Sequence, residues 1–261
     1  MTDAGAVGAP DPAGLTGVNA RTPEDGAFDA AGGEGGVGGP GATDLAGVGA
    51  AGVAGVAGGP DGIGGLGATD LAALAALDRR EQLRRLVAEL AVIRGRVTLA
   101  SGREADYYVD LRRVTLHHLA APLVGHLLLD LLEERGLVAG EDYAAAGGLT
   151  MGADPVAGAM LHAAAARGLD LDAFVVRKDA KAHGLQRRIE GPDVAGRRVV
   201  AVEDTSTTGG SVITAVEALR EAGAEVAAVA VIVDRSTGAG AKIEALGLPY
   251  YYLFGLADLG L

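Results

Sequence analysis

The segment RVVAVEDTSTTGGS, residues 198–211, constrains the fold of this chain more than any other. It starts with an apolar, β-branched run at residues 199–202, which is typical of a buried strand. Two adjacent carboxylates follow, Glu203 and Asp204, and a turn rich in hydroxyl groups and glycine then leads to a helical pattern that begins at Val212. Backbone N–H groups at the start of a helix favour an anion. Because the carboxylates can also accept hydrogen bonds from sugar hydroxyls, the segment predicts a site for a phosphorylated sugar.

Simpler interpretations of this segment are an ordinary helix cap or a common nucleotide-binding loop. A cap needs one hydroxyl, whereas this turn has five and follows two acids. The chain has no Gly-x-x-x-x-Gly-Lys loop, and no Gly-x-Gly-x-x-Gly follows a strand with the expected acid downstream. Neither a Walker loop nor a dinucleotide-binding turn therefore explains the pattern.

Beyond residue 140, short apolar runs alternate with helical patterns. This alternation predicts an α/β fold, with a parallel, doubly wound sheet and helices on both faces. Ligands of such sheets bind at the carboxyl ends of the strands, where Glu203 and Asp204 are expected to lie. We predict strands at residues 143–148, 172–177, 197–203, 225–234 and 249–254, and helices at residues 155–167, 212–222 and 242–246.

The region before this alternation has a different pattern. Apolar residues at helical spacing predict one helix over residues 71–93, ended by Gly95. Residues 97–110 read as two strands joined by a Ser-Gly turn, and a further helix is predicted over residues 120–135. We expect a small N-terminal cap, or hood, at about residues 71–115, placed over a core at about residues 116–261.

The first 70 residues differ from the rest in composition. They hold 22 of the 43 glycines, nine acids, one arginine and no lysine, and GATDL occurs in them and at their end, at 41–45 and 67–71. So little apolar surface cannot offset the entropy of ordering, and we predict a disordered, low-complexity tail over residues 1–70. Irregular spacing argues against a glycine-rich repeat array that packs on itself. The tail carries a net charge of −8 out of −12, so the acidity of the chain is mostly a property of the tail.

Composition also excludes several classes of protein. There is no cysteine, which rules out disulfides, thiolate catalysis and cysteine-based metal sites. The sequence has neither a basic stripe nor interleaved aromatic residues, so nothing in it suggests nucleic-acid binding. No apolar run is long enough to span a membrane, and the start of the chain lacks the pattern of a signal peptide. We therefore expect a cytoplasmic protein with no membrane or nucleic-acid partner.

The acid-acid-x-x-Thr-x-Gly-x-Ser pattern at residues 203–211 resembles the phosphoribosyl-pyrophosphate (PRPP) motif of type I phosphoribosyltransferases. Three further segments resemble the orotate phosphoribosyltransferase family: VTLASGREADYYVD at 97–110, RKDAKAH at 177–183 and VDR at 233–235. The resemblance covers nearly all of residues 75–261 and none of the tail. It implies a type I phosphoribosyltransferase-like sheet flanked by helices. It also implies transfer of the phosphoribosyl group from PRPP to orotate, which gives orotidine 5′-phosphate and pyrophosphate in pyrimidine biosynthesis.

The resemblance also implies roles for particular residues. Residues 177–188 match a loop that closes over PRPP, partly at the site of a neighbouring subunit, so a homodimer is implied. Its cations would stabilise the departing pyrophosphate. The implied catalytic residues are Lys178, Lys181, His183 and Asp204. The implied PRPP-binding residues are Arg177, Lys178, Lys181, His183, Glu203, Asp204, Thr205, Ser206, Thr207, Thr208, Gly209, Gly210 and Ser211.

Orotate would be oriented by residues of the hairpin and of two strand ends. The implied contacts are Thr207, Arg235, Ser101 and Tyr108, while Tyr107 fits a ring contact and a core position equally well. A guanidinium such as that of Arg235 suits a planar anion because it can donate paired hydrogen bonds. The implied cofactor is Mg²⁺, held mainly by PRPP with no direct protein ligand. His117, His118, His126 and His162 have no metal-site spacing and are interpreted as structural.

The chain departs from the family pattern at two places. Ala100 stands where many members have a lysine, and residues 151–153 (Met-Gly-Ala) stand where many have a Tyr-Lys-Gly turn, so that Gly152 replaces a second lysine. The turn at residues 147–153 can still bind pyrophosphate through backbone N–H groups. Two alternatives stay open: a regulator that senses PRPP, and a phosphoribosyltransferase for a different base.

Overall fold

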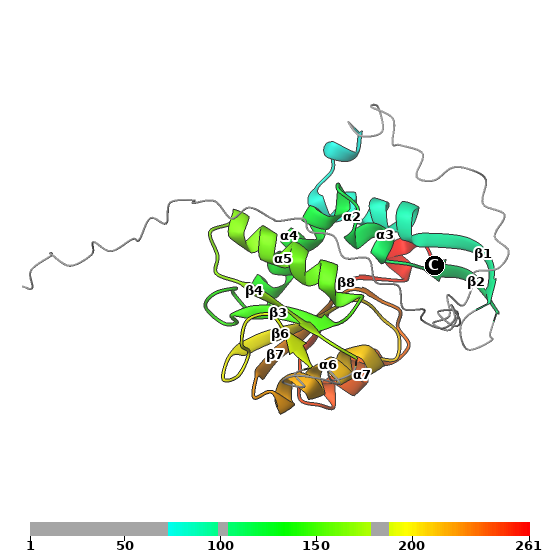
Figure 1. Cartoon of the computed structure of the whole chain (residues 1–261). Helices are drawn as coiled ribbons and strands as arrows, with labels where there is room; N and C mark the ends of the chain where they lie inside the picture. Colours follow the sequence, from blue (N-terminus) through cyan, green and yellow to red (C-terminus); the bar gives the residue numbers. More distant parts are fainter. Residues whose placement is uncertain (1–72, 99–103, 179–187) are drawn as a thin grey trace, which may run out of the picture. The chain divides into compact units, whose positions relative to one another are not determined.

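The computed structural model describes residues 73–98, 104–178 and 188–261 (Figure 1). The tail predicted for residues 1–70 lies outside these ranges. So do the tip of the predicted hairpin, at residues 99–103, and residues 179–187 of the predicted loop. Among the described residues, no helix is long and apolar enough to cross a membrane.

A six-stranded sheet forms the centre of the core. The order across the sheet is β5-β4-β3-β6-β7-β8, and all neighbouring pairs are parallel except β4 and β5. The predicted α/β fold with a parallel sheet is confirmed. The strand order changes direction between β3 and β6, and ligands of open α/β sheets bind at such a point. The strands are β3 (Ala145–Leu149), β4 (Asp172–Val176), β5 (Ile189–Glu190), β6 (Arg198–Ser206), β7 (Glu225–Asp234) and β8 (Tyr250–Gly255).

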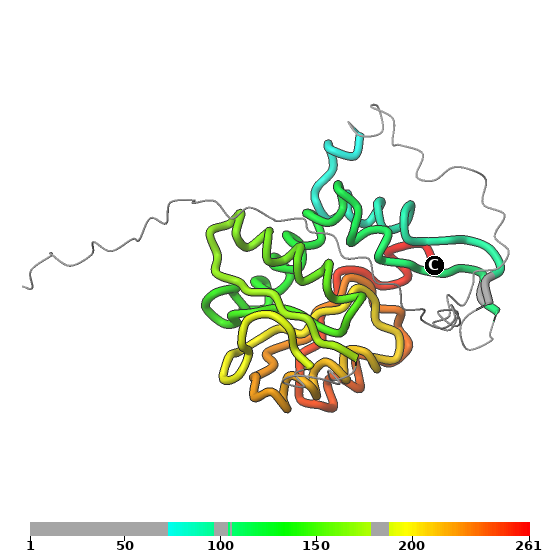
Figure 2. Tube along the Cα trace, viewed as in Figure 1, coloured from blue at the N-terminus to red at the C-terminus, as the bar shows by residue number. Residues whose placement is uncertain are grey.

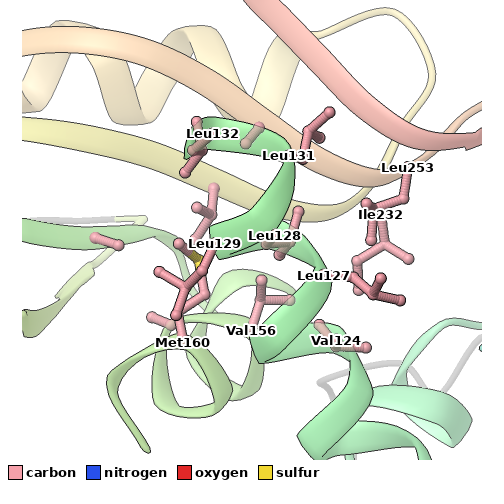
Figure 3. Close-up of a cluster of buried hydrophobic side chains, with 14 of the residues drawn as sticks. Val124, Leu127, Leu128, Leu129, Leu131, Leu132, Val156, Met160, Ile232 and Leu253 are labelled. Atoms are coloured by element: carbon pink, nitrogen blue, oxygen red, sulfur yellow. The ribbon is translucent and has the colours of Figure 1, made fainter. Parts of the chain in front are cut away.

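Helices cover both faces of this sheet (Figure 1). On one face lie α4 (Ala120–Glu133) and α5 (Ala153–Ala166), and on the other lie α6 (Gly210–Glu221) and α7 (Ala239–Glu244). Figure 3 shows α4 packed beside α5 and against β7 and β8. Its leucines, which recur at helical spacing, are buried among Val156 and Met160 of α5 and Ile232 and Leu253 of β7 and β8. Burial of these apolar faces on both sides of the sheet holds the strand ends in place.

A smaller unit, the hood, precedes the core in the sequence. It contains α2 (Arg79–Leu86), a π-helical turn η1 (Val87–Ala91), β1 (Val92–Thr98), β2 (Glu104–Val109) and α3 (Arg112–Thr115). Strands β1 and β2 form an antiparallel two-stranded sheet of their own, as the hairpin pattern predicts. Buried residues of α2 and η1 join the same apolar cluster as α4. Figure 2 shows the hood beside the C-terminal segment, where the last 3₁₀ turn is η2 (Ala257–Leu259). The division of the chain near residue 115 stays a prediction.

The prediction of one helix from residue 71 to residue 93 is wrong. Helix α2 starts after Asp78, whose carboxylate accepts a hydrogen bond of 2.9 Å from the backbone N–H of Glu81 and so caps the helix. The helical backbone ends at Ala91, because the next two residues pair with β2 as a strand. Gly95 does not end a helix: it lies in β1 with φ of +131°, where the register of the hairpin shifts.

Strand β6 is longer than the predicted strand at residues 197–203. It continues to Ser206, because Glu203, Thr205 and Ser206 pair with β7. The two acids therefore lie inside the paired strand, two to three residues before its end. The turn that follows is correspondingly shorter, since α6 starts at Gly210.

Other differences are local. Strand β3 starts at Ala145 instead of residue 143, and α7 lies over residues 239–244 instead of 242–246. Strand β5 and helix α3 are not in the predictions, because each is too short to show a periodic pattern. Because β5 runs antiparallel to β4, the sheet is parallel except at this edge.

Candidate active site

A cleft of about 370 Å³ opens at the point where the strand order changes direction. One wall comes from the hood, at residues 108–112. The other comes from the turn after β3, at residues 149–152, and from the end of β6. A hollow of about 470 Å³ lies elsewhere, between residues 188–195 and α6, and it has neither paired acids nor the start of a helix. The remaining residues that line the cleft are Lys178, Glu203, Asp204, Thr205, Thr207 and Ser211.

Glu203 and Asp204 form a buried acidic pair in this cleft. Their exposed fractions are only 5% and 8%. The backbone N–H of Asp204 donates to Oε1 of Glu203 at 3.2 Å, and that of Thr205 donates to Oδ1 of Asp204 at 2.6 Å. Burial, together with the charge of Asp204, raises the pKa of Glu203 to about 8, and burial also raises the pKa of Asp204. A cation or a hydrogen-bond donor placed in the cleft would therefore favour the ionised pair.

The turn after β6 forms a hollow of about 160 Å³, lined by residues 205–212. Gly209 has φ of +80° and precedes the first residue of α6, so the free N–H groups of a 12-residue helix face this hollow. The hydroxyl groups differ in exposure: Thr207, Thr208 and Ser211 are exposed, whereas Ser206 is 2% exposed. The hydroxyl group of Thr205 has no hydrogen-bond partner among the described residues. The hollow is sized and lined for a single phosphate group.

The predicted cationic loop is described only at its two ends. Arg177 and Lys178 line a hollow with Thr150 and Glu190, and Nη1 of Arg177 lies 3.4 Å from Oε1 of Glu190. Lys178 is exposed and also lines the main cleft. Lys181 and His183 lie outside the described residues.

The predicted orotate contacts are only partly brought together. Tyr108 is half-buried and lines the cleft beside Thr207, whereas Tyr107 packs against the main apolar cluster. Arg235 follows β7, and its backbone N–H donates to the carbonyl oxygen of Ser206 at 2.9 Å. It is near the end of β6 in the backbone but does not line the cleft. Ser101 lies outside the described residues.

Arg112 and Asp110 line the cleft and are absent from the sequence-based predictions. Nε and Nη2 of Arg112 donate to the two carboxylate oxygens of Asp110 at 2.8 and 3.1 Å, and the backbone N–H of Arg112 donates to Oδ1 at 3.2 Å. This two-pronged pair, at the start of the short helix α3, fixes the guanidinium at the cleft wall. An Asp-Leu-Arg sequence directly after the second strand of the hairpin is the one signal that could have indicated it.

The four described histidines do not line the cleft. Nδ1 of His126 accepts a hydrogen bond of 3.1 Å from Arg167, and burial lowers the pKa of His126. The rings of His117 and His118 lie 4.6 Å apart. Within the described residues, no three or more histidine or acidic side chains form a group that could hold a metal ion.

The sheet, the buried acids and the phosphate-sized hollow at the start of α6 define a phosphoribosyltransferase of type I. In agreement, the model of the phosphoribosyl transferase domain family matches residues 148–245. The chain is 66% identical over 185 residues to the orotate phosphoribosyltransferase of Streptomyces coelicolor, which covers 70% of this chain and 98% of that protein. The chain belongs to the orotate phosphoribosyltransferase family, whose members are pentosyltransferases.

Solved structures agree with this assignment. An orotate phosphoribosyltransferase of Mycobacterium tuberculosis in complex with Fe(III) dicitrate has a TM-score of 0.63 and 58% identity, over 70% of this chain and 99% of that chain. The same enzyme in complex with PRPP has a TM-score of 0.60 and 53% identity, with the same coverage. The hood and the core of this chain therefore both have counterparts in that fold.

Proposed function

We propose that this enzyme binds PRPP and orotate in the cleft between the hood and the end of β6. There it transfers the phosphoribosyl group to a ring nitrogen of orotate, which gives orotidine 5′-phosphate and pyrophosphate. The observation that carries this proposal is the position of the buried acids Glu203 and Asp204, between a phosphate-sized hollow and the wall that holds Tyr108. The PRPP complex of the related mycobacterial enzyme supports PRPP as the donor.

The core would hold PRPP by both ends. The 5′-phosphate fits the hollow at residues 205–212, where Thr207, Thr208 and Ser211 offer exposed hydroxyl groups beside the start of α6. Glu203 and Asp204 would accept hydrogen bonds from the ribose hydroxyls. The diphosphate would lie along the turn at residues 149–152, within reach of Lys178. These contacts place the bond that breaks, between C1 of ribose and the diphosphate, in the middle of the cleft.

Mg²⁺ fits this arrangement as the cofactor. It prefers oxygen ligands, and a cation beside the acidic pair would favour the ionised carboxylates that burial disfavours. Because the described residues form no complete metal site, most ligands would come from the oxygens of PRPP. Bound there, Mg²⁺ would withdraw electron density from the leaving diphosphate.

The cationic loop would act on the leaving group. Arg177, Lys178, Lys181 and His183 would neutralise the charge that develops on pyrophosphate, and closure of the loop would exclude water from the ribosyl cation.

We also propose a homodimer in which the loop at residues 177–188 serves the partner's site. The match of residues 177–188 to the loop of the family supports this pairing. The disordered tail and the cytoplasmic location stay predictions.

Orotate would bind on the hood side of the cleft. Tyr108 offers a ring face and Thr207 a hydroxyl, and Arg235 and Ser101 are the further contacts that the family pattern implies. The attack comes from a ring nitrogen of orotate itself, so no nucleophilic side chain is required.

The proposal is tested by the loss of orotate absorbance when PRPP and Mg²⁺ are added to the purified protein. A Lys181→Ala variant should consume orotate at least about 100-fold more slowly, because a cation that stabilises the leaving group acts mainly in the transition state. Arg85→Ala, at an exposed residue of α2 outside the cleft, is the control and should stay within about twofold of the wild type. If the wild-type protein binds PRPP in a calorimeter but leaves orotate intact, the function is that of a PRPP sensor or of a transferase for another base.

A further inference from the structure

Gly152 lies in the turn after β3, with its Cα against the two acids of β6. A Cβ atom built on Gly152 would overlap Oε1 of Glu203 and lie 2.9 Å from Oδ1 of Asp204. Gly152 has φ of −70° and ψ of −44°, a conformation that any residue adopts. The backbone therefore does not require glycine at this position; the carboxylates require the space.

The carboxylate of Glu203 lines the cleft, but burial and one hydrogen bond hold it in place. Its side chain is 5% exposed, and its Oε1 accepts the backbone N–H of Asp204 at 3.2 Å. That oxygen thus lies between a backbone donor of β6 and the Cα of Gly152. The turn after β3 thus lies closely against the end of β6, and Oε1 of Glu203 is the atom nearest to a Cβ built on Gly152.

We propose that Gly152 is a positioning residue for the transfer reaction. Its bare Cα allows the turn that binds the diphosphate to lie directly on the carboxylate that holds the ribose. The contact sets the separation between the two halves of PRPP, and the bond that breaks lies between them. This inference rests on the proposed function, which assigns the turn to the diphosphate and Glu203 to the ribose.

The expected cost of disturbing the contact follows from geometry. A side chain at position 152 must displace either the turn or Glu203 by about 1 Å, and a misplacement of that size can cost a reaction about 100-fold. The loss should appear in the kinetics with PRPP, whereas the hood, which binds orotate, is not involved in the contact. Displacement of Glu203 would also alter its burial, so the pH profile of the reaction should change.

The first test compares Gly152→Ala with the matched control Gly158→Ala. Gly158 is a helical residue of α5, and no atom lies within 4 Å of a Cβ built on it. Gly152→Ala should lower kcat/KM for PRPP by about 100-fold, leave the KM for orotate within about twofold and shift the pH profile. Gly158→Ala should match the wild type in all three. A Gly152→Ala enzyme with unchanged PRPP kinetics and an unchanged pH profile would overturn the proposal.

The second test is a double-mutant cycle with Glu203→Asp. Aspartate is one methylene shorter, so its carboxylate withdraws from position 152 and leaves room for the new methyl group. In the Glu203→Asp background, Gly152→Ala should therefore cost at least about tenfold less in PRPP affinity, measured by calorimetry, than in the wild type. If the two losses simply multiply, Gly152 and Glu203 act independently and the proposal is wrong.

Folding is measured on the same four proteins. If Gly152→Ala alone unfolds, the double variant should recover a cooperative melting transition near that of Glu203→Asp, and an unrecovered double variant counts against the contact. The wild-type turnover of orotate distinguishes a failure of the proposed function from a failure of the proposed contact between positions 152 and 203. Its absence would overturn the proposed function, whereas the coupling between positions 152 and 203 in PRPP binding and melting is measured without turnover.

Discussion

Glu203 shows how a single side chain connects sequence, burial and function in this enzyme. The residue follows a strand that is apolar in sequence, and the chain continues the strand through it, so the carboxylate is carried into the interior. Burial raises its pKa to about 8, which means that the empty site favours a protonated acid near neutral pH. Binding of a cation and of sugar hydroxyls would compensate for the free energy that ionisation of this buried carboxyl costs in the free protein.

The raised pKa of Glu203 has a testable effect on stability. The native state binds a proton that the unfolded state has lost, so the free energy of unfolding of the free protein should fall as pH rises from about 4.5 to about 8. Glutamine cannot ionise, and a Glu203→Gln variant should lack this part of the loss. Relative to the wild type, the variant should gain roughly 3 kcal/mol between pH 5 and pH 8, measured by urea denaturation without ligand.

The matched control is Glu217→Gln, at an exposed residue of α6, which should leave the pH dependence of the wild type unchanged. A wild-type protein whose stability stays level or rises between pH 5 and pH 8 would contradict the prediction. So would equal pH dependence in Glu203→Gln and Glu217→Gln.

At the scale of elements, the turn after β3 divides its residues between two tasks. Gly152 packs inward on the acids, whereas the neighbouring Met151 is 68% exposed and lines the cleft. The sequence pattern placed the lysine of related enzymes at Gly152, but a side chain there would overlap Glu203. The position with room for a long side chain is Met151. In this chain a lysine would therefore fit at position 151 and not at position 152.

A lysine at position 151 should strengthen PRPP binding. In Met151→Lys the ammonium group would reach the diphosphate that we propose beside the turn, and its stem would replace the methionine without burial of a charge. The KM for PRPP should fall by about three- to tenfold, since an exposed ion pair contributes about 1 kcal/mol. Steady-state kinetics with PRPP as the varied substrate measure this.

Leu116→Lys is the control for an added charge, because Leu116 is exposed and lies outside the cleft. It should leave the KM for PRPP unchanged. An equal fall in both variants would indicate a general electrostatic effect, and no fall in Met151→Lys would show that the diphosphate lies elsewhere.

At the scale of the whole described unit, the hood depends on the end of the chain. The guanidinium of Arg80 in α2 lies 4.9 Å from the ring centre of Phe254 and donates to the carbonyl oxygen of Leu253. Nη1 of Arg84 donates to the carbonyl oxygen of Asp258 at 3.1 Å. These contacts join α2 to β8 and η2, more than 170 residues apart in sequence. The wall of the cleft that carries Tyr108 is therefore anchored from the opposite end of the chain.

Removal of this anchor should loosen the hood. An Arg80→Ala variant loses a cation–π contact and a hydrogen bond, together about 1–2 kcal/mol. Amide hydrogen exchange in α2 and η1 should accelerate about 5- to 30-fold, and the KM for orotate should rise, because the wall with Tyr108 becomes less ordered. Arg85→Ala is the control, since Arg85 pairs only with Glu81 on its own helix in the described structure. Exchange no faster in Arg80→Ala than in Arg85→Ala would contradict the prediction.

Local patterns were sufficient for most of the fold. The apolar run of β7 and the alternation that surrounds it predict the parallel sheet, because alternate burial of strands and helices leaves a direct trace in hydrophobicity. The hydroxyl-rich turn before α6 also predicts an anion site correctly from local sequence, because all of its hydrogen-bond donors come from adjacent residues. Short or interrupted elements left no such trace, as β5, α3 and the break at Asp78 show.

The acidic pair, the glycine and the arginine of the cleft depend on residues that are distant in sequence. The burial of Glu203, the contact that requires Gly152 and the presence of Arg112 at the cleft wall all arise where the hood, β3 and β6 meet. Sequence patterns locate binding residues that are neighbours along one turn. Exposure, proton affinity and steric room are set by atoms brought together from several segments, so they follow only from the packed structure.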